Sequence, residues 1–153
     1  MTWYRKCVGT EGVIVEVPEI VGKQRPRFDP RRGRAYTPKK TTDAEAMIRS
    51  AWMEQVGGRW ADFRGPVEVT VTFKRELAKS NPKFWKGRDD LGKPDLDNAL
   101  KCVLDALNGI AYRDDAQVVS IWAMKQELSP HGCGNRIFVY VRYYEEIFVE
   151  ERI

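Results

Sequence analysis

The sequence predicts an α+β fold in which a small mixed or antiparallel sheet carries two helices on one face. Two segments with helical spacing of apolar residues interrupt four segments in which apolar and polar residues alternate. The resulting order is β, α, β, α, β, β, which is typical of an α+β domain. The chain has 153 residues, enough for one substantial core, so we expect a single domain over 1–153.

The clearest strand is Pro66–Lys74, because Val67, Val69, Val71 and Phe73 alternate with polar residues along it. The same criterion predicts three further strands. They are Gly12–Val17, Gln117–Gln126 and Arg136–Tyr144.

The first helix is expected to start at Thr42, because Thr42-Asp43-Ala44-Glu45 has the spacing of a capping box, and to stop at Gly57-Gly58. Its apolar face would comprise Ala44, Met47, Ile48, Ala51 and Trp52. The second helix is expected over 95–108, with Asn108-Gly109 as its stop. Its apolar stripe would comprise Leu96, Ala99, Leu100, Val103, Leu104 and Leu107.

Composition and local patterns argue against a membrane protein or a disulfide scaffold. No apolar run approaches the roughly 20 residues that a membrane span needs, and Met1–Cys7 does not resemble a secretory signal. The three cysteines, Cys7, Cys102 and Cys133, have no zinc-type spacing. We therefore expect a cytoplasmic protein without a membrane partner.

Positive charge is concentrated in two loop segments, 21–40 and 74–93. The first carries eight basic residues against Asp29 alone, and the second carries seven against three acids. Such segments on an otherwise acidic chain indicate a footprint for a polyanion, with aromatic residues available to pack on sugars or bases. Solvated loops that keep the protein in solution are the alternative.

Acidic residues gather at the start of the second helix, in Lys93-Pro94-Asp95-Leu96-Asp97-Asn98. Carboxylate oxygens without His or paired Cys are typical ligands of Mg²⁺, which is often held together with substrate phosphates. The alternative is structural: acids favour a helix N-terminus, and Asp97 could pair with Lys101. The two interpretations are equally good on these residues alone.

A second acidic pair, Asp114-Asp115, follows the helix. The helix from Asp95 to Asn108 is roughly 20 Å long, so the start of the next strand would lie far from Asp95. Either the return loop over 109–113 folds back, or the acidic pair belongs to a second site.

The block over 93–125 closely resembles the RusA family of Holliday junction resolvases. The resemblance rests on Lys93-Pro94-Asp95-Leu96-Asp97-Asn98, Leu104–Gly109 and Asp114–Val119 ending in Lys125, and extends to Gly22–Phe28 and Tyr36-Thr37-Pro38. The chain departs from the family in its N-terminal lead, Met1–Glu11, its extended Lys79–Asp90 loop and its acidic tail, which contains Glu145, Glu146, Glu150 and Glu151. These departures leave the preferred DNA shape open.

The resemblance implies a homodimeric, Mg²⁺-dependent endodeoxyribonuclease, with Mn²⁺ as a possible substitute. It would resolve four-way DNA junctions by paired nicks in recombination and repair, in the cytoplasm and nucleoid of a bacterial or phage-infected cell. A non-catalytic phage accessory protein that binds branched DNA, or a nuclease of the same fold that cuts forks or flaps, are the alternatives. By position, the implied metal ligands are Asp95, Asp97 and Asp115, and the implied catalytic lysine is Lys101.

Other residues are expected around these groups. Asn98 and Asp114 would support the ligands. Contacts with DNA are expected from Lys23, Arg25, Arg27, Arg31, Arg32, Arg34, Lys83, Trp85, Lys86, Arg88, Lys93 and Lys125. Trp85 could also stack on a base or enter a junction as a wedge.

Several chemically suggestive residues are better explained structurally. His131 is expected in a turn and Cys102 in the packing of the second helix. Trp52, Trp60 and Trp122 are expected in the core or at an interface.

Overall fold

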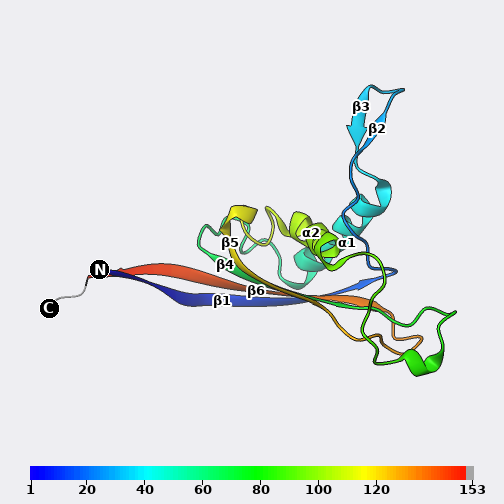
Figure 1. The fold of residues 1–153 in the computed structure, drawn as a ribbon. Helices are drawn as coiled ribbons and strands as arrows, with labels where there is room; N and C mark the ends of the chain where they lie inside the picture. The colour runs from blue at the N-terminus through cyan, green and yellow to red at the C-terminus, as the bar shows by residue number, and fades with distance from the viewer. Residues whose placement is uncertain (151–153) are drawn as a thin grey trace.

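The fold is a four-stranded mixed sheet with two helices on one face, seen in a computed structural model that describes residues 1–150 (Figure 1). The sheet has the order β1-β6-β4-β5; β6 is antiparallel to both β1 and β4, and β4 is parallel to β5. This confirms the predicted fold class. The elements are β1 (Thr2–Val17), α1 (Lys39–Gln55), β4 (Val67–Lys74), α2 (Leu96–Leu107), β5 (Val118–Lys125) and β6 (Asn135–Val149). None of the helices in this range is long and apolar enough to cross a membrane.

The parallel pair β4–β5 requires a crossover, and α2 provides it. On β4, the residues predicted to face inward are all buried, from Val67 to Phe73. On α2, Ala99, Val103 and Leu107 are fully buried against them. The helix begins after Asp95 and ends before Asn108, as predicted, and Gly109 adopts φ +83° just beyond it.

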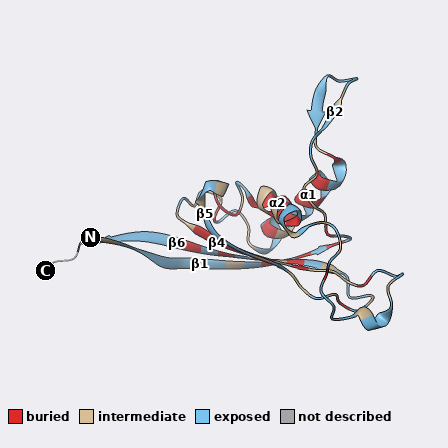
Figure 2. Ribbon diagram, in the orientation of Figure 1, coloured by how far each residue is buried: buried red, intermediate tan, exposed pale blue. Residues whose placement is uncertain are grey.

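The core lies between the helices and the inner face of the sheet (Figure 2). Trp60 stacks on Tyr143 with ring centroids 3.9 Å apart, and Trp52 is completely buried. The prediction of a core or interface position is thus confirmed for Trp52 and Trp60. Trp122 lies on the edge strand β5 and is 71% exposed, so it is not a core residue, and its interface position stays a prediction.

The predicted start of the first helix is wrong. Helix α1 begins at Lys39 after the N-cap residue Pro38, and the Thr42 hydroxyl donates to the Lys39 carbonyl instead of capping the helix. Pro38 has the extended backbone of an N-cap residue, and its carbonyl accepts hydrogen bonds from the N–H groups of Thr41 at 3.1 Å and Thr42 at 3.3 Å, so the helix starts just after it. The predicted stop is correct, since α1 ends at Gln55 and Gly57 has a positive φ.

Strands β1 and β6 are far longer than predicted. Their outer halves, Thr2–Cys7 and Tyr144–Val149, pair as a ribbon that leaves the body (Figure 1). Trp3 and Phe148 face each other there, with ring centroids 5.0 Å apart. The ribbon is exposed on both faces, so it lacks the one-sided burial that makes a strand recognisable in sequence. Glu151 of the acidic tail lies outside the described residues.

The basic segment 21–40, predicted to be a loop, contains a short hairpin. Strand β2 (Arg27–Asp29) pairs with β3 (Arg34–Tyr36), and this hairpin projects from the body (Figure 1). The second basic segment is a long loop that contains only a short 3₁₀ helix, η1 (Lys83–Trp85).

The buried hydroxyl of Tyr143 offers a test of the core. It donates to the Ala111 carbonyl at 2.7 Å, so Tyr143→Phe leaves a buried carbonyl without its partner. We expect the variant to lose about 1–2 kcal/mol of unfolding free energy in urea titration. Tyr4→Phe, on the exposed ribbon, is the control and should change stability little; equal losses in both variants would contradict this account of the core.

Candidate active site and nucleic-acid interface

Asp95 is the N-cap residue of α2, yet its side chain makes no capping hydrogen bond. Its carboxylate instead accepts a hydrogen bond from Lys93 Nζ at 2.8 Å. This bond, with the charges of Lys93 and Lys125, lowers the pKa of Asp95. The side chain is 56% exposed. Asp95 therefore presents an ionised carboxylate to solvent at the positive end of a helix.

Asp97 and Lys101 are exposed on α2, one helical turn apart. Within residues 1–150, neither makes a salt bridge, so the predicted pairing of Asp97 with Lys101 is absent. Leu96, between the two acids, packs against the core from a partly buried position. Both acids lie at the N-terminus of α2, where the helix dipole favours them, but the side-chain cap of Asp95 and the Asp97–Lys101 ion pair are absent from the described residues.

Asp115 begins a second 3₁₀ helix, η2 (Asp115–Gln117), just before β5. Its carboxylate accepts a hydrogen bond from the buried Tyr112 hydroxyl at 3.1 Å. Burial raises the pKa of Asp115, the Tyr112 bond opposes this rise, and the charges of Asp105 and Asp114 add to it. The ionised form of Asp115 is therefore disfavoured in the isolated chain.

Asp114 and Gln117 hold η2 in place. The two form a reciprocal capping box, and Gln117 Nε2 also donates to the carbonyls of Phe63 at 2.7 Å and Gly65 at 2.9 Å. The position of Asp115 is thus fixed by hydrogen bonds to the loop before β4. Asp114, expected to support a ligand, supports the segment that carries Asp115.

The two acidic groups lie at opposite ends of the crossover. Twelve residues of α2 span about 18 Å, and β5 separates Asp115 from Lys125 by about 23 Å. Lys125 is close enough to Asp95 to affect its pKa, so Asp95 lies near the far end of β5. Within 1–150 no three His, Cys, Asp or Glu side chains gather closely enough to hold a metal ion. The return loop does not fold Asp115 back toward Asp95.

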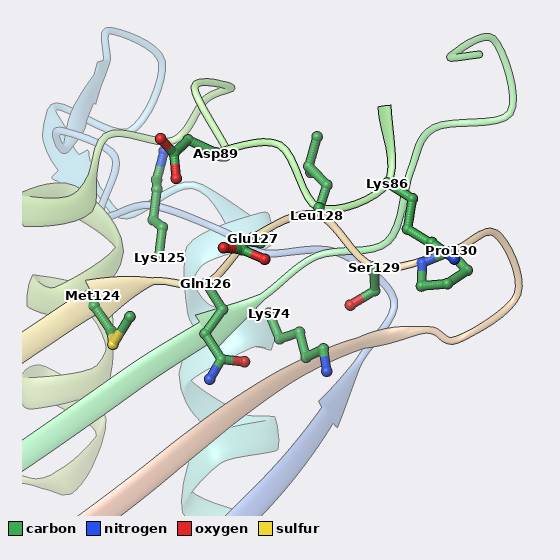
Figure 3. A pocket seen from close by; sticks show the side chains of 11 residues that line it. Lys74, Lys86, Asp89, Met124, Lys125, Gln126, Glu127, Leu128, Ser129 and Pro130 are labelled. Atoms are coloured by element: carbon green, nitrogen blue, oxygen red, sulfur yellow. The ribbon is translucent and has the colours of Figure 1, made fainter. Parts of the chain in front are cut away.

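A basic hollow of about 640 Å³ lies beside the Asp95 end of the crossover (Figure 3). Lys74 from the end of β4, Lys86 from the long loop and Lys125 from the end of β5 line it, together with two acids, Asp89 and Glu127. Lys125 Nζ donates to the Gly92 carbonyl at 2.6 Å, which ties the loop to β5. Lys74 belongs to the second basic segment but was not among the expected DNA contacts, because it ends an ordinary strand.

Lys23, which was expected to contact DNA, instead forms ion pairs with two carboxylates of the protein. Its ammonium lies 2.7 Å from Glu45 on α1 and 2.9 Å from Asp105 on α2, and its side chain is only 22% exposed. The hydrogen bond with Glu45 is the largest of the effects that raise the pKa of Lys23. Its backbone N–H also donates to the Asn98 carbonyl at 3.0 Å. Lys23 thus fastens the base of the basic segment to both helices.

The remaining basic residues are mostly exposed. The five arginines of 21–40 lie on or beside the projecting hairpin, and Arg88 lies over the Trp85 ring at 4.6 Å from its centroid. Lys83, Lys86 and Lys93 are exposed on the long loop. These groups are arranged around the α2 N-terminus, so the two basic segments share one end of the molecule with Asp95 (Figure 1).

Two other candidates have structural roles. Cys102 is buried on α2, and burial raises the pKa of its thiol to about 11, which confirms a packing position. His131 lies within 3.2 Å of the Asn81 carbonyl in a loop. Tyr112 was missed in the sequence, although it stands three residues before Asp115; only its burial and its hydrogen bond reveal its role.

Comparison with known protein families identifies the class of protein to which this fold and these exposed acids belong. A family model described as Endodeoxyribonuclease RusA matches residues 18–142. The chain therefore belongs to the RusA endodeoxyribonuclease family. Both the candidate acids and the basic segments lie inside the matched range, whereas all of β1 and the outer half of β6 lie outside it.

A curated relative shares part of this sequence. The uncharacterized protein YqaN of Bacillus subtilis (strain 168) is 42% identical over 69 residues, which is 40% of this chain and 49% of YqaN. The chain thus spans about half the length of that relative.

The Lys23 ion pairs predict a measurable loss of stability. Lys23→Met leaves the nearly buried Glu45 carboxylate without its cation, and we expect a loss of about 1–3 kcal/mol in urea unfolding at neutral pH. Because the pKa of Lys23 is raised on folding, its stabilisation is complete below the ordinary lysine pKa and disappears as the pH rises through the folded pKa. The difference between parent and variant should therefore shrink at alkaline pH.

Lys101→Met is the matched control, since Lys101 is exposed without an ion pair in the described chain. A Lys23→Met protein as stable as Lys101→Met at neutral pH would show that the ion pairs contribute nothing.

Proposed function

We propose that the protein is a Mg²⁺-dependent endodeoxyribonuclease that resolves four-way DNA junctions by paired nicks, in recombination and repair. The observation that carries this proposal is the exposed pair Asp95 and Asp97 at the α2 N-terminus, next to Lys101, in a chain of the RusA family. Asp97 makes no ion pair within residues 1–150, and Asp95 pairs only with the exposed Lys93 beside it. Both acids are exposed next to a basic surface and neither packs in the core. They fit a site that handles phosphate through a cation.

The donor set agrees with the chemistry of magnesium. Asp95 and Asp97 would hold the ion from one protomer, and Mg²⁺ is commonly bound by one or two carboxylates, water and substrate phosphate. Mn²⁺ accepts the same oxygen ligands. When bound, the ion would polarise the scissile phosphate and lower the pKa of a coordinated water. Lys93 now neutralises Asp95, so it would have to move from that carboxylate toward the DNA backbone.

Asp115 would join the site from a second copy of the chain. Strand β5 forms an open edge of the sheet and exposes the apolar residues Val119, Ile121, Trp122 and Met124, a surface that proteins normally cover. A twofold axis normal to the sheet would set two β5 edges antiparallel. The start of one β5, with Asp115, would then lie beside the end of the other, with Asp95 and Asp97. Two equivalent composite sites would result, one for each nick.

The chain's own residues would then divide the work. Lys101, one turn beyond Asp97 on the exposed face of α2, would stabilise negative charge that develops on the phosphate. The Tyr112 hydroxyl would keep the Asp115 carboxylate oriented. Asn98, whose backbone is fixed by Lys23, would hold the first turn of α2 in position.

DNA would be held through its phosphates by the basic loops and the hollow in Figure 3. Lys74, Lys86 and Lys125 line that hollow beside the Asp95 end of the crossover. Contacts of this kind give affinity without reading sequence.

The acids separate an enzyme from a DNA-binding accessory protein. Asp95→Asn, Asp97→Asn and Asp115→Asn each remove a negative charge needed by the cation, so we expect cleavage of a synthetic four-way junction in Mg²⁺ to fall by orders of magnitude. Binding in EDTA should persist or improve, because fewer carboxylates repel the phosphates. Gel assays of cleavage and binding measure both quantities.

Asp105→Asn is the control, since Asp105 lies on the same helix but pairs with Lys23 and should be dispensable for cleavage. Asp115→Asn should be no less stable than the parent without metal, because it removes a charge that folding disfavours. Full cleavage by all three variants would refute the assigned acids. Cleavage of forks or flaps in preference to four-way junctions would retain the chemistry and change the substrate.

Mixing variants tests the composite site. A heterodimer of Asp95→Asn with Asp115→Asn has one site with both defects and one site that is fully intact. Co-refolded mixtures of the two inactive proteins should therefore regain about a quarter of the parental sites and nick one strand per junction. Sites built within one protomer would regain none.

The matched control mixes Asp95→Asn with Asp97→Asn. These residues lie at the same end of α2, so each site of the heterodimer keeps one defect and no activity should return. A denaturing gel of junctions labelled on each strand shows whether one strand or two strands of a junction are cut.

A further inference from the structure

We propose that the β2–β3 hairpin is a branch-sensing arm whose Phe28 stacks on a base exposed at the point where DNA strands diverge. This inference rests on the proposed action on branched DNA and adds the element that recognises the branch. It assigns a role to a feature that phosphate binding alone leaves unexplained, an exposed aromatic ring on a projecting basic hairpin.

Phe28 has no packing role in the protein. It is 65% exposed, and the residue opposite it in the hairpin is the small Ala35. Tyr36, opposite Arg27, is 46% exposed. Neither ring belongs to the buried core. The hairpin therefore carries apolar surface out into solvent, away from the core (Figure 2).

The charge around Phe28 selects a nucleic acid as that partner. Arg25, Arg27, Arg31, Arg32 and Arg34 lie on or next to the hairpin, against the single acid Asp29. Such a surface repels a basic protein partner and attracts a phosphate backbone. The combination of aromatic rings with arginines is typical of proteins that bind unpaired bases.

Asp29 builds the turn and also pairs with Arg32, whose Nε lies 3.6 Å from its Oδ2. The other four arginines of the arm make no ion pair within residues 1–150. The Asp29 carboxylate accepts the Arg31 N–H at 2.9 Å, and the Asp29 carbonyl accepts the Gly33 N–H at 2.9 Å. Gly33 has φ +65°, a conformation that favours glycine. The turn is thus preformed, which lowers the entropy cost of binding.

The base of the arm is fixed next to the candidate acids. Lys23 and Gln24 bond to Asn98 on α2 and to Thr41 on α1, and a hollow of about 340 Å³ between this segment and α2 is lined by Asp95 and Asn98. Seven residues from Gln24 to Arg31 reach about 23 Å when extended. The tip can therefore reach DNA about two thirds of a duplex turn away from a phosphate held at Asp95. A branch at that distance would expose a base that is no longer fully stacked.

The test compares binding of a four-way junction and of a linear duplex in EDTA, where no cleavage occurs. Phe28→Ala should weaken junction binding about 5- to 100-fold, the usual range for one stacked base, and change duplex binding less than about twofold. Phe28→Trp should retain junction binding. A 2-aminopurine at the branch point should change its fluorescence on binding of the parent and of Phe28→Trp, but not of Phe28→Ala.

Two further variants separate stacking from charge. Arg31→Ala should weaken junction and duplex binding alike and reduce the salt dependence by about one counterion. Phe84→Ala, which removes an even more exposed phenylalanine (81%) on the long basic loop, should leave the junction-to-duplex ratio unchanged. The inference is overturned if Phe28→Ala alters that ratio no more than Phe84→Ala does.

The outcomes are independent of the nuclease proposal. Phe28-dependent junction binding by a protein that never cleaves would sustain the arm and overturn the enzyme. Cleavage with an unchanged junction preference in Phe28→Ala would do the reverse.

Discussion

The parallel pairing of β4 with β5 is the constraint on which the arrangement of the molecule depends. Two neighbouring parallel strands can be joined only by a crossover, so α2 must run the length of the sheet with its N-terminus at the carboxyl ends of both strands. That geometry places Asp95 and Asp97 at the end of the sheet where β4 and β5 finish, with Lys125 near Asp95, and where the basic loops emerge. It also places Asp115 at the opposite end, because η2 must precede β5. The separation of the acids thus follows from the topology of the sheet.

A second constraint joins the basic segment to this frame. Lys23 contacts a carboxylate on each helix, and its backbone bonds to Asn98 in the first turn of α2. A partly buried lysine with two carboxylate partners is costly to separate from them, so the base of the hairpin is tied to the start of α2. The hairpin tip, by contrast, is held mainly by its own turn. The molecule therefore combines a fixed base near the acids with an arm that extends toward the substrate.

The sequence revealed those parts of the fold in which one face is buried. Strand β4 and helix α2 were predicted almost to the residue, because their apolar spacing reports the core directly. The ribbon of β1 and β6 escaped prediction because both of its faces are exposed, and the start of α1 was displaced by Pro38. The same limit applies to the site. The acids were recognisable from their local pattern, whereas the ion pairs of Lys23 and the bond from Tyr112 to Asp115 join residues through tertiary contacts that spacing does not encode.

In the isolated chain, the surroundings of Asp95 and Asp115 shift the pKa values of the two carboxyl groups in opposite directions. Lys93 balances Asp95 and lowers its pKa, whereas burial and neighbouring acids raise the pKa of Asp115. On the proposed arrangement, association of two chains would bring Asp115 toward two further carboxylates, which opposes assembly unless a cation is present. Metal binding and association would then be linked: the ion would tighten the dimer, and the dimer would raise affinity for the ion by the same factor. A single chain would hold Asp115 apart from Asp95 and Asp97, so cleavage would require both the cation and the second chain.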